Sequence, residues 1–386
     1  MREVVGHLAS FDRPSASAGE RRAADWIAAR LEAEGCRARV EEERAHGTYW
    51  WPLGLLTAAA GLAGWRAGRA GRLLVGALTA AAVADDISGG GLWFRRLLPR
   101  HAAWNVVAEC GDLQAPRTLV LVAHHDAAHW SLLFHPRLPE LFGERFPGLL
   151  ERSNTTPPVM FPVFGGPLLV ALSGISGSRA LRRAATVLAL GAAAVMAEIG
   201  SRSVVPGAND NLSGVATLVG VARALRERPV AGLRVLLVST GSEESFMEGM
   251  QGFARRHFPS LPRERTHIVC VDTVGSERLM ELEGEGMLVM RDYPAAFKDL
   301  LSDCAAAAGV ELVRGLRFRN ATDGLIALRR GYPAAMIGSI TRYKAPANYH
   351  WPSDTAANLD DATVVRAIRL CEQVARTLAA DPDAGR

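Results

Sequence analysis

The chain has 386 residues, of which 49% are hydrophobic and 22% charged, and this composition excludes a wholly disordered protein. Its 44 basic and 40 acidic residues give a net charge of +4, which is too balanced for a protein dedicated to binding nucleic acid. At about 150 residues per domain, the length predicts two or three domains, or one large α/β domain with insertions.

The cysteines and the N-terminus narrow the class of protein further. Five cysteines lie far apart and form no closely spaced pair, which disfavours a disulfide scaffold or a cysteine-based zinc site. We expect buried free thiols instead. The first 26 residues carry several charges, among them Glu3 and Asp12, and have no apolar core, so we expect no secretory signal peptide there.

The first 48 residues have the pattern of a soluble segment. Apolar residues between Ala24 and Ala33 recur with helical spacing, and Gly35 ends the pattern. The alternation from Arg37 to Glu42 predicts a strand. We therefore assign residues 1–48 to the main folded domain.

Two later segments have the composition of hydrophobic helical hairpins with basic tips. In the first, residues 47–65 carry no charge, Arg66, Arg69 and Arg72 follow, and a second apolar run covers residues 73–84. In the second, residues 153–178 carry no charge, Arg179, Arg182 and Arg183 follow, and an apolar run covers residues 184–197. We place these insertions at residues 49–100 and 153–200.

The hairpins allow two interpretations, because a membrane span needs about 20 apolar residues and some of the runs are shorter. Either residues 49–98 and 155–200 enter a membrane, or the helices pack together on a soluble domain. Tryptophans at the segment ends, such as Trp50 and Trp65, favour the membrane. The arginine tips would then face the cytoplasm, and the main domain of this multi-pass, bacterial-type membrane protein would lie on the non-cytoplasmic side. Hairpins that dip into one leaflet from the cytoplasm are the other arrangement.

Outside the hairpins, strand-like and helix-like patterns alternate. Short β-branched runs predict buried strands at 118–123, 233–240, 268–274 and 334–340. Helical patterns cover 212–228, 244–257, 294–308 and 360–380. The alternation predicts an α/β fold with a mostly parallel sheet covered on both faces. Residues 1–48, 101–152 and 201–386 would form this domain.

Polar residues with metal-ligand chemistry follow these strands, where loops converge on one edge of the sheet. They are His124 and Asp126 after the first strand, Asp210 in the turn 207–214, Glu243 and Glu244 after the second strand, Asp272 late in the third, and His350 in the last loop. Histidines and carboxylates suit zinc, and a water shared by two zinc ions becomes a nucleophile near neutral pH. Glu243 would be the general base beside that water.

Each of these features also has an ordinary structural explanation. The turn around Asp210 could only cap a helix, and the Glu243–Glu244 pair could only complement a helix dipole. Asp272 differs, because a carboxylate in an apolar strand is costly unless it is paired or bound to a metal. The ordered series at successive strand ends, rather than any one member, favours a metal site.

The series resembles the co-catalytic zinc aminopeptidases and carboxypeptidases of metallopeptidase family 28. The matching segments are VAHHDAAH (122–129), GANDNLSG (207–214), STGSEESFMEGMQGF (239–253), VCVDTVGS (269–276), RNATDGLIALRRGYPAAMIG (319–338) and NYHWPSDTAANLD (348–360). The resemblance covers residues 104–130 and 201–380, and residues 1–48 loosely, but not the hairpins. It implies a three-layer α/β/α sandwich of the zinc exopeptidase type.

The resemblance implies two Zn²⁺ ions per chain and a role for each site residue. One ion is bound by His124, Asp210 and Asp272, and the other by Asp210, Glu244 and His350, so that Asp210 bridges them. Glu243 moves a proton from the bridging water to the leaving amine. Asp126 fixes the orientation of His124 through its far nitrogen. Asp354 is expected to support the loop of His350, and Asp323, which matches a recurring acidic residue of the family, is expected to be structural.

The chain departs from the family pattern at three places. His125 stands where an aromatic residue is usual, and with His129 it is expected to support the pocket rather than bind metal. The segment between Asp126 and Asp210 spans 83 residues instead of a short loop, and could form a lid or hold the site near a membrane. Tyr343 and Tyr349 are both candidates to stabilise the tetrahedral intermediate.

These inferences predict a membrane-tethered, zinc-dependent exopeptidase that acts on peptides, with an aminopeptidase as the first choice. The sequence predicts no nucleic-acid partner and gives no oligomeric state. Two alternatives remain on the same fold, a catalytically inactive binding domain and a glutaminyl-cyclase-type acyl transferase, which uses one zinc. All five ligand positions and Glu243 are filled, which favours the peptidase.

Overall fold

A single mixed sheet organises the chain in the computed structural model, which describes residues 1–381 and 384–385. Its strands are β1 (Arg37–Ala45), β2 (His101–Gly111), β3 (Thr118–His124), β4 (Arg234–Thr240), β5 (Thr266–Val271), β6 (Arg278–Glu285), β7 (Arg291–Asp292), β8 (Val313–Phe318) and β9 (Ala334–Ile340). The order is β1-β2-β4-β3-β5-β9-β6-β7, with β8 paired to β6. The central strands β4, β3, β5 and β9 run parallel, and the flanking pairs β1–β2, β2–β4, β6–β9 and β6–β7 are antiparallel.

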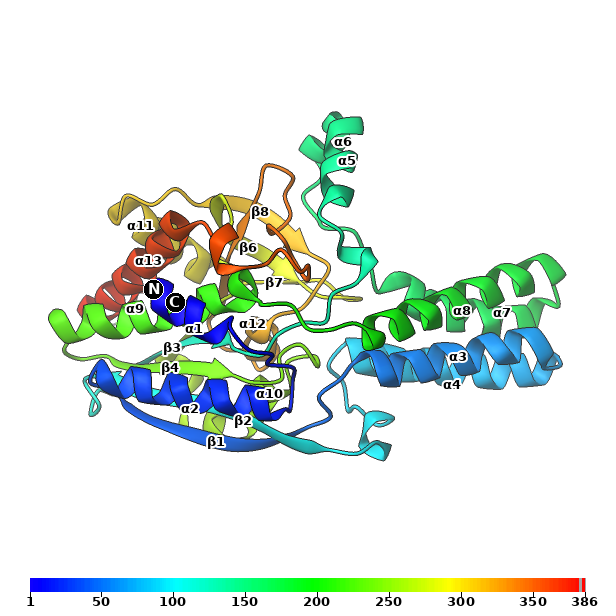
Figure 1. The fold of residues 1–386 in the computed structure, drawn as a ribbon, viewed down its shortest axis with the longest axis horizontal. Coiled ribbons are helices and arrows are strands. Elements are labelled where there is room, and N and C mark those ends of the chain that lie inside the picture. The colour runs from blue at the N-terminus through cyan, green and yellow to red at the C-terminus, as the bar shows by residue number, and fades with distance from the viewer. Residues whose placement is uncertain (382–383, 386) are drawn as a thin grey trace.

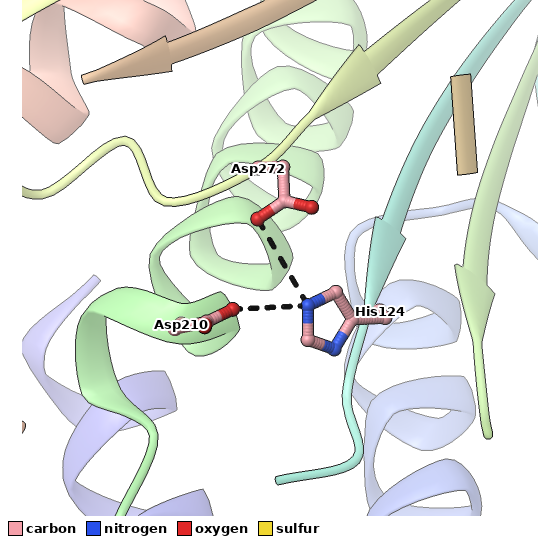
Figure 2. Close-up of side chains that lie close together, drawn as sticks. All are labelled: His124, Asp210 and Asp272. Atoms are coloured by element: carbon pink, nitrogen blue, oxygen red, sulfur yellow. Dashed lines mark hydrogen bonds and ion pairs between the residues drawn. The ribbon is translucent and has the colours of Figure 1, made fainter. Parts of the chain in front are cut away.

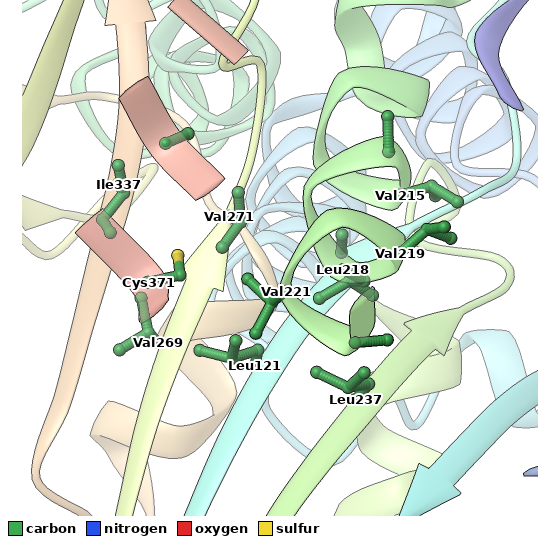
Figure 3. Close-up of a cluster of buried hydrophobic side chains, with 14 of the residues drawn as sticks. Leu121, Val215, Leu218, Val219, Val221, Leu237, Val269, Val271, Ile337 and Cys371 are labelled. Atoms are coloured by element: carbon green, nitrogen blue, oxygen red, sulfur yellow. The ribbon is translucent and has the colours of Figure 1, made fainter. Parts of the chain in front are cut away.

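Helices cover both faces of the sheet. One face packs against α1 (Arg2–Leu8), α2 (Ala18–Ala33), α9 (Ser213–Glu227), α11 (Ala295–Ala307) and α13 (Asp361–Ala380), and the other against α10 (Glu248–His257) and α12 (Asp323–Arg329). Side chains alternate along each strand, so that Leu121 enters the first core and Val122 the second. Figure 3 shows the first core between the strands, α9 and α13. These layers confirm the predicted α/β/α sandwich.

The predicted hairpins form a bundle that projects from the sheet domain (Figure 1). Its helices are α3 (Trp50–Arg66), α4 (Arg69–Ile87), α7 (Phe161–Ser176) and α8 (Arg179–Ser201). The turns between α3 and α4 and between α7 and α8 lie at the end far from the sheet, so the arginines at both turns gather at one tip. Among the described residues, only α8 is both long and apolar enough to cross a membrane, and α7 is apolar but shorter. Length and composition alone therefore do not establish the predicted multi-pass arrangement.

Residues 132–152 form an arm beside the bundle (Figure 1). The arm contains the single-turn helix Leu132–Phe134 and the helices α5 (Arg137–Arg145) and α6 (Pro147–Arg152). The Lys344 amine donates hydrogen bonds to the carbonyls of Leu150 and Ser153 near the end of α6, which anchors the arm to the sheet domain. Further helical turns are Arg95–Leu97, Ala208–Leu212, Phe258–Ser260, Arg263–Arg265 and Ala356–Asn358.

The cysteines are all free, and four of the five are buried, as expected.

Candidate metal centre and active site

The carboxyl ends of the parallel strands bring the predicted site residues to one edge of the sheet. His124 is the last residue of β3, and Asp272 follows β5 directly. Asp210 comes from the helical turn that precedes α9. Figure 2 shows these three side chains pointing toward one another from separate elements. The parallel register of β3 with β5 sets this convergence, because both strands end at the same edge.

His124, Asp210 and Asp272 form the first predicted ligand group. His124 Nε2 lies 3.1 Å from Asp210 Oδ1 and 3.9 Å from Asp272 Oδ1. One donor atom from each residue lies within 4.8 Å of the others, and all three side chains are buried. The distances between the donors leave room for one shared cation.

Asp210, Glu244 and His350 form the second predicted group. His350 Nε2 lies 3.1 Å from Asp210 Oδ2 and 3.4 Å from Glu244 Oε1, and this triad also has donor atoms within 4.8 Å of one another. Asp210 therefore turns one oxygen toward each histidine and belongs to both groups. Glu243 lies beside them, with its Oε2 3.9 Å from His124 Nε2.

The centre gathers more negative charge than the fold neutralises. Burial raises the pKa of Asp272 and of Glu243 well above the carboxyl range, and nearby carboxylates raise both further. Burial opposes the charged form of His350, but the negative charges of Glu244 and Asp210 outweigh it and raise the pKa of His350 to about 10. The cluster thus favours positive charge at its centre.

The donor set fits zinc. Asp210 Oδ2 and Glu244 Oε1 are buried and accept no well-aligned hydrogen bond from the described residues. Unpaired buried carboxylate oxygens are costly, and a bound cation would satisfy both. The cleft at the donors has a volume of about 30 Å³, above the roughly 10–15 Å³ that a single water molecule needs. Nitrogen and oxygen donors around such a small space are those that zinc prefers.

Asp126 positions two parts of the centre at once. Its Oδ1 lies 3.4 Å from His124 Nδ1, which fits the predicted orienting role. Its two oxygens also accept the backbone N–H groups of Glu243 and Glu244, each at 3.1 Å, and Oδ2 accepts from the Ser15 hydroxyl at 2.6 Å. The carboxylate therefore fixes the loop that carries the predicted base, a contact that the sequence did not reveal.

Of the other predicted supporting residues, Tyr349 lines the cleft, whereas His125, His129 and Tyr343 are not among its lining residues. His125 points away from the cleft to the Ser239 hydroxyl at 2.9 Å, and burial lowers the pKa of His125 to about 3. His129 faces the Arg202 carbonyl instead, so the two histidines share no pocket. Tyr349 lines the cleft and stacks on the His350 ring, with centroids 3.9 Å apart. Tyr343 lies below the arm, near Gly143.

Asp354 and Asp323 hold the backbone near the ligands. Asp354 accepts the N–H groups of Asn209 at 2.7 Å and Asp210 at 3.1 Å, so it supports the turn that carries Asp210. Asp323 accepts a hydrogen bond from the Thr240 hydroxyl at the end of β4. The arm also reaches the site, because the Phe134 ring packs edge-on against His350, with centroids 4.7 Å apart.

Two supporting groups were missed in the sequence. Glu20, on α2, accepts the N–H groups of Ala16 at 2.7 Å and Ser242 at 2.9 Å, next to the loop of Glu243. Burial, followed by the charge of Asp126, raises the pKa of Glu20 to about 8. Glu20 has the spacing of an ordinary helix-capping residue after Ser17, so no local signal links it to Ser242.

The second missed group joins the base of the bundle to the site loop. The buried Arg95 pairs with Asp86 at 2.7 Å and donates to the Ser245 carbonyl at 2.8 Å. Glu248 accepts from the Ser245 hydroxyl at 2.7 Å and lies 2.6 Å from His46 Nδ1. The position of the loop thus depends on residues from both sides of the first hairpin.

Comparisons with known proteins show which family model and which folds the chain resembles. The family model described as peptidase family M28 matches residues 191–375. A glutaminyl cyclase from Tannerella forsythia superposes with a TM-score of 0.57 at 15% identity over 97% of this chain and 96% of that chain. A Zn-dependent exopeptidase from Parabacteroides distasonis gives 0.56 at 12% identity over 98% and 96%. An aminopeptidase from Aneurinibacillus sp. strain AM-1 gives 0.55 at 12% identity over 97% and 92%.

At these identities the superpositions show a shared fold, and the sequence match relates residues 191–375 to peptidase family M28. A search of curated proteins found no match to this sequence. The fold class and the metallo-exopeptidase type of hydrolase predicted from the sequence are confirmed.

Proposed function

We propose, on the premise that the chain carries a peptidase family M28 domain, that it is an aminopeptidase with two Zn²⁺ ions in its centre. The choice of aminopeptidase depends on the charge of the cleft. Four carboxylates line it, and none of its described lining residues is a lysine or arginine. A carboxypeptidase holds the terminal carboxylate of its substrate with a cationic side chain, and the described lining of this cleft offers none.

In this proposal each site residue has a separate task. His124, Asp210 and Asp272 would hold one zinc ion, and Asp210, Glu244 and His350 the other. Zinc supplies Lewis-acid activation of water and of the scissile carbonyl when it is bound. The Glu243 carboxylate takes a proton from the attacking water and returns it to the leaving amine. Asp126 keeps His124 and the Glu243 backbone in place, and Tyr349, which lines the cleft, would donate its hydroxyl to a substrate oxygen.

Hydrolysis of aminoacyl-anilides by zinc-loaded protein tests the proposal. We expect release of the free amino acid from substrates with a free α-amine, and no hydrolysis after N-acetylation. Metal analysis should give two zinc ions per chain. Cleavage of N-acetylated peptides with a free carboxylate would make the enzyme a carboxypeptidase instead.

A second candidate is a glutaminyl-cyclase-type acyl transferase, because structures named as glutaminyl cyclases superpose on this chain. A peptide with N-terminal glutamine separates the two reactions. A cyclase releases ammonia and keeps the peptide length, whereas an aminopeptidase releases glutamine. The two overlapping ligand groups favour the peptidase, and a zinc-loaded chain that turns over neither substrate would be a binding domain.

We further propose that the bundle inserts into a membrane. Its helices approach through glycines, as membrane helices do: a Cβ added at Gly61 would lie 2.5 Å from Leu190 Cδ2, and one at Gly166 would lie 2.8 Å from Ala189 Cα. Large apolar side chains face outward, including Leu74 at 62% exposure and Val187 at 71%. The 23 residues of α8 extend roughly 34 Å, enough to cross a hydrocarbon core of about 30 Å.

The arginine tip would face the cytoplasm and the peptidase domain the opposite side. Fractionation in alkaline carbonate should leave the protein in the membrane pellet. In spheroplasts, a membrane-impermeant thiol reagent should label the variant Glu42→Cys in the sheet domain and not Gly68→Cys at the tip. The reverse labelling pattern would invert the sidedness, and release into the carbonate supernatant would reject insertion.

A further inference from the structure

A second cavity, of about 280 Å³, lies beside the base of the bundle. It is enclosed by the loop that follows α4, by α10 and by α12. Five arginines line it, Leu92 and Ile326 give it an apolar part, and no acidic residue is among its described lining residues. Its size is just below the roughly 300–1,000 Å³ typical of pockets for small molecules.

Most of these arginines have no anionic partner. Within the described part of the chain, no carboxylate oxygen lies within 4.0 Å of a side-chain nitrogen of Arg96, Arg100, Arg329 or Arg330. The fifth, Arg255, lies 3.7 Å from Glu43 at the surface.

The nearby acidic groups are engaged elsewhere. Asp86 pairs with the buried Arg95, and Asp85 accepts the backbone N–H groups of Gly91 at 2.6 Å and Trp93 at 3.0 Å. The fold thus supplies a counterion for Arg95 but leaves its neighbour Arg96, together with Arg100, Arg329 and Arg330, without one.

Arg329 is the most enclosed member of the cluster, and the loop makes space for it. Its guanidinium packs against Gly89, where a Cβ would collide with Nη1, and Gly89 has a φ of +60° that disfavours other residues. Burial and the like charge of Arg291 lower the pKa of Arg329, and the charge of Glu285 only partly opposes them. A half-buried arginine with no carboxylate oxygen within 4.0 Å favours a site shaped for an external anion.

We propose that this cavity binds a phosphate group, either in the headgroup of an anionic phospholipid or in a free phosphate. The planar guanidinium fork matches phosphate oxygens in a bidentate manner, and several forks around one cavity are typical of phosphate sites. The cavity begins two residues after α4 ends at Ile87, and its apolar part could contact the start of an acyl chain. The lipid source rests on the proposed membrane insertion, whereas the phosphate chemistry does not.

Two binding measurements on the full chain in detergent separate the sources. Native mass spectrometry after exposure to phosphatidylglycerol or to phosphatidylcholine reports retained lipid, and calorimetric titration with inorganic phosphate reports the free anion. The variant Arg96→Gln/Arg329→Gln/Arg330→Gln removes three charges from the cavity. Arg37→Gln/Arg44→Gln/Arg369→Gln removes the same charge from exposed positions outside it. The milder Arg96→Gln/Arg100→Gln changes only exposed side chains, in case the triple variant fails to fold.

We expect the wild type and the control to bind at least one of the two probes, with phosphatidylglycerol preferred over phosphatidylcholine. Each cavity arginine removed should weaken binding by roughly tenfold. Retention of phosphatidylglycerol alone identifies a lipid headgroup, and phosphate binding alone identifies a free anion. The proposal is overturned if the wild type binds neither probe, or if the cavity and control variants lose equal affinity. Neither assay depends on zinc or peptide hydrolysis, so the result is independent of the proposed peptidase activity.

Discussion

The acidic cleft and the arginine cavity carry opposite charge, and the fold surrounds them differently. The cleft at the strand ends is about 30 Å³, and its carboxylates and histidines are buried and held by partners such as Asp126 and Asp354. The arginine cavity is about 280 Å³, and only Arg329 among its arginines is substantially enclosed. Buried donors held by hydrogen bonds suit small ions stripped of water, whereas exposed arginines suit a larger anion that keeps part of its hydration.

The largest effect should come from the base in the acidic cleft. Glu243→Gln removes the proton acceptor and leaves all five metal ligands, so we expect turnover to fall about 10²- to 10⁴-fold while zinc content stays unchanged. Anilide hydrolysis and metal analysis on the same sample measure both. Glu42→Gln, at an exposed position on β1, is the matched control and should keep full activity. Undiminished turnover in Glu243→Gln would remove this residue from the mechanism.

A neutral residue at the bridging position tests whether the cleft needs its charge to hold ions. Asp210→Asn should retain at most one zinc ion, because an amide balances two cations poorly. Zinc should then raise the Tm of the variant less than that of the wild type, since stabilisation by a ligand follows its affinity. Elemental analysis gives the stoichiometry, and Asp299→Asn on the surface of α11 is the control. Two ions retained in Asp210→Asn would contradict the bridging role.

Another buried carboxylate, Glu285, shows how burial changes a pKa where no ion pair is present among the described residues. Glu285 accepts hydrogen bonds from Tyr293 and from Thr322, and burial raises its pKa from 4.5 to about 7. Because the folded-state pKa is the higher one, Glu285 favours the folded state below pH 4.5, and this contribution is lost as the pH rises to about 7.

Glu285→Gln should therefore gain stability relative to the wild type by on the order of 3 kcal/mol between pH 4.5 and pH 8. Urea unfolding at both pH values measures the change. A constant difference between variant and wild type across this range would mean that Glu285 ionises normally in the folded protein.

The sequence predicted the four parallel strands at the centre of the sheet and the antiparallel edge strand β1, but it missed the other four strands. The strand at 334–340 has the predicted bounds, because a short β-branched run between turns is a buried strand in almost any context. The strand β2 was not predicted, and neither was β6. Both pair antiparallel with distant partners, β2 with β1 and β4, and β6 with β9, and no local pattern specifies such partners.

The site shows the same difference between features with a local sequence pattern, which were predicted, and contacts between distant elements, which were not. His124, Asp210 and His350 have side chains whose chemistry is readable where a strand or turn ends, and the structure brings them together. Glu20 and Arg95 support the loop of Glu243 from other elements, and their own neighbours in the sequence explain them adequately as a helix cap and a surface charge. Supporting contacts depend on tertiary packing, which only the structure reveals.

The smallest effect should come from a substitution in the helical bundle. The bundle lies beside the arginine cavity, and its proposed insertion into a membrane is the reason to expect a lipid headgroup in that cavity. Gly166→Leu places a side chain against the Ala189 backbone, and such overpacking costs roughly 1–3 kcal/mol. Gly191→Leu lies in the same bundle, but nothing lies within 4 Å of its Cβ position. We expect the first variant to lower the Tm in detergent by a few degrees and the second to leave it unchanged, with zinc content equal in both. Equal melting would show that close glycine contacts do not hold the bundle together, and would weaken the case that a membrane brings lipid headgroups to the arginine cavity.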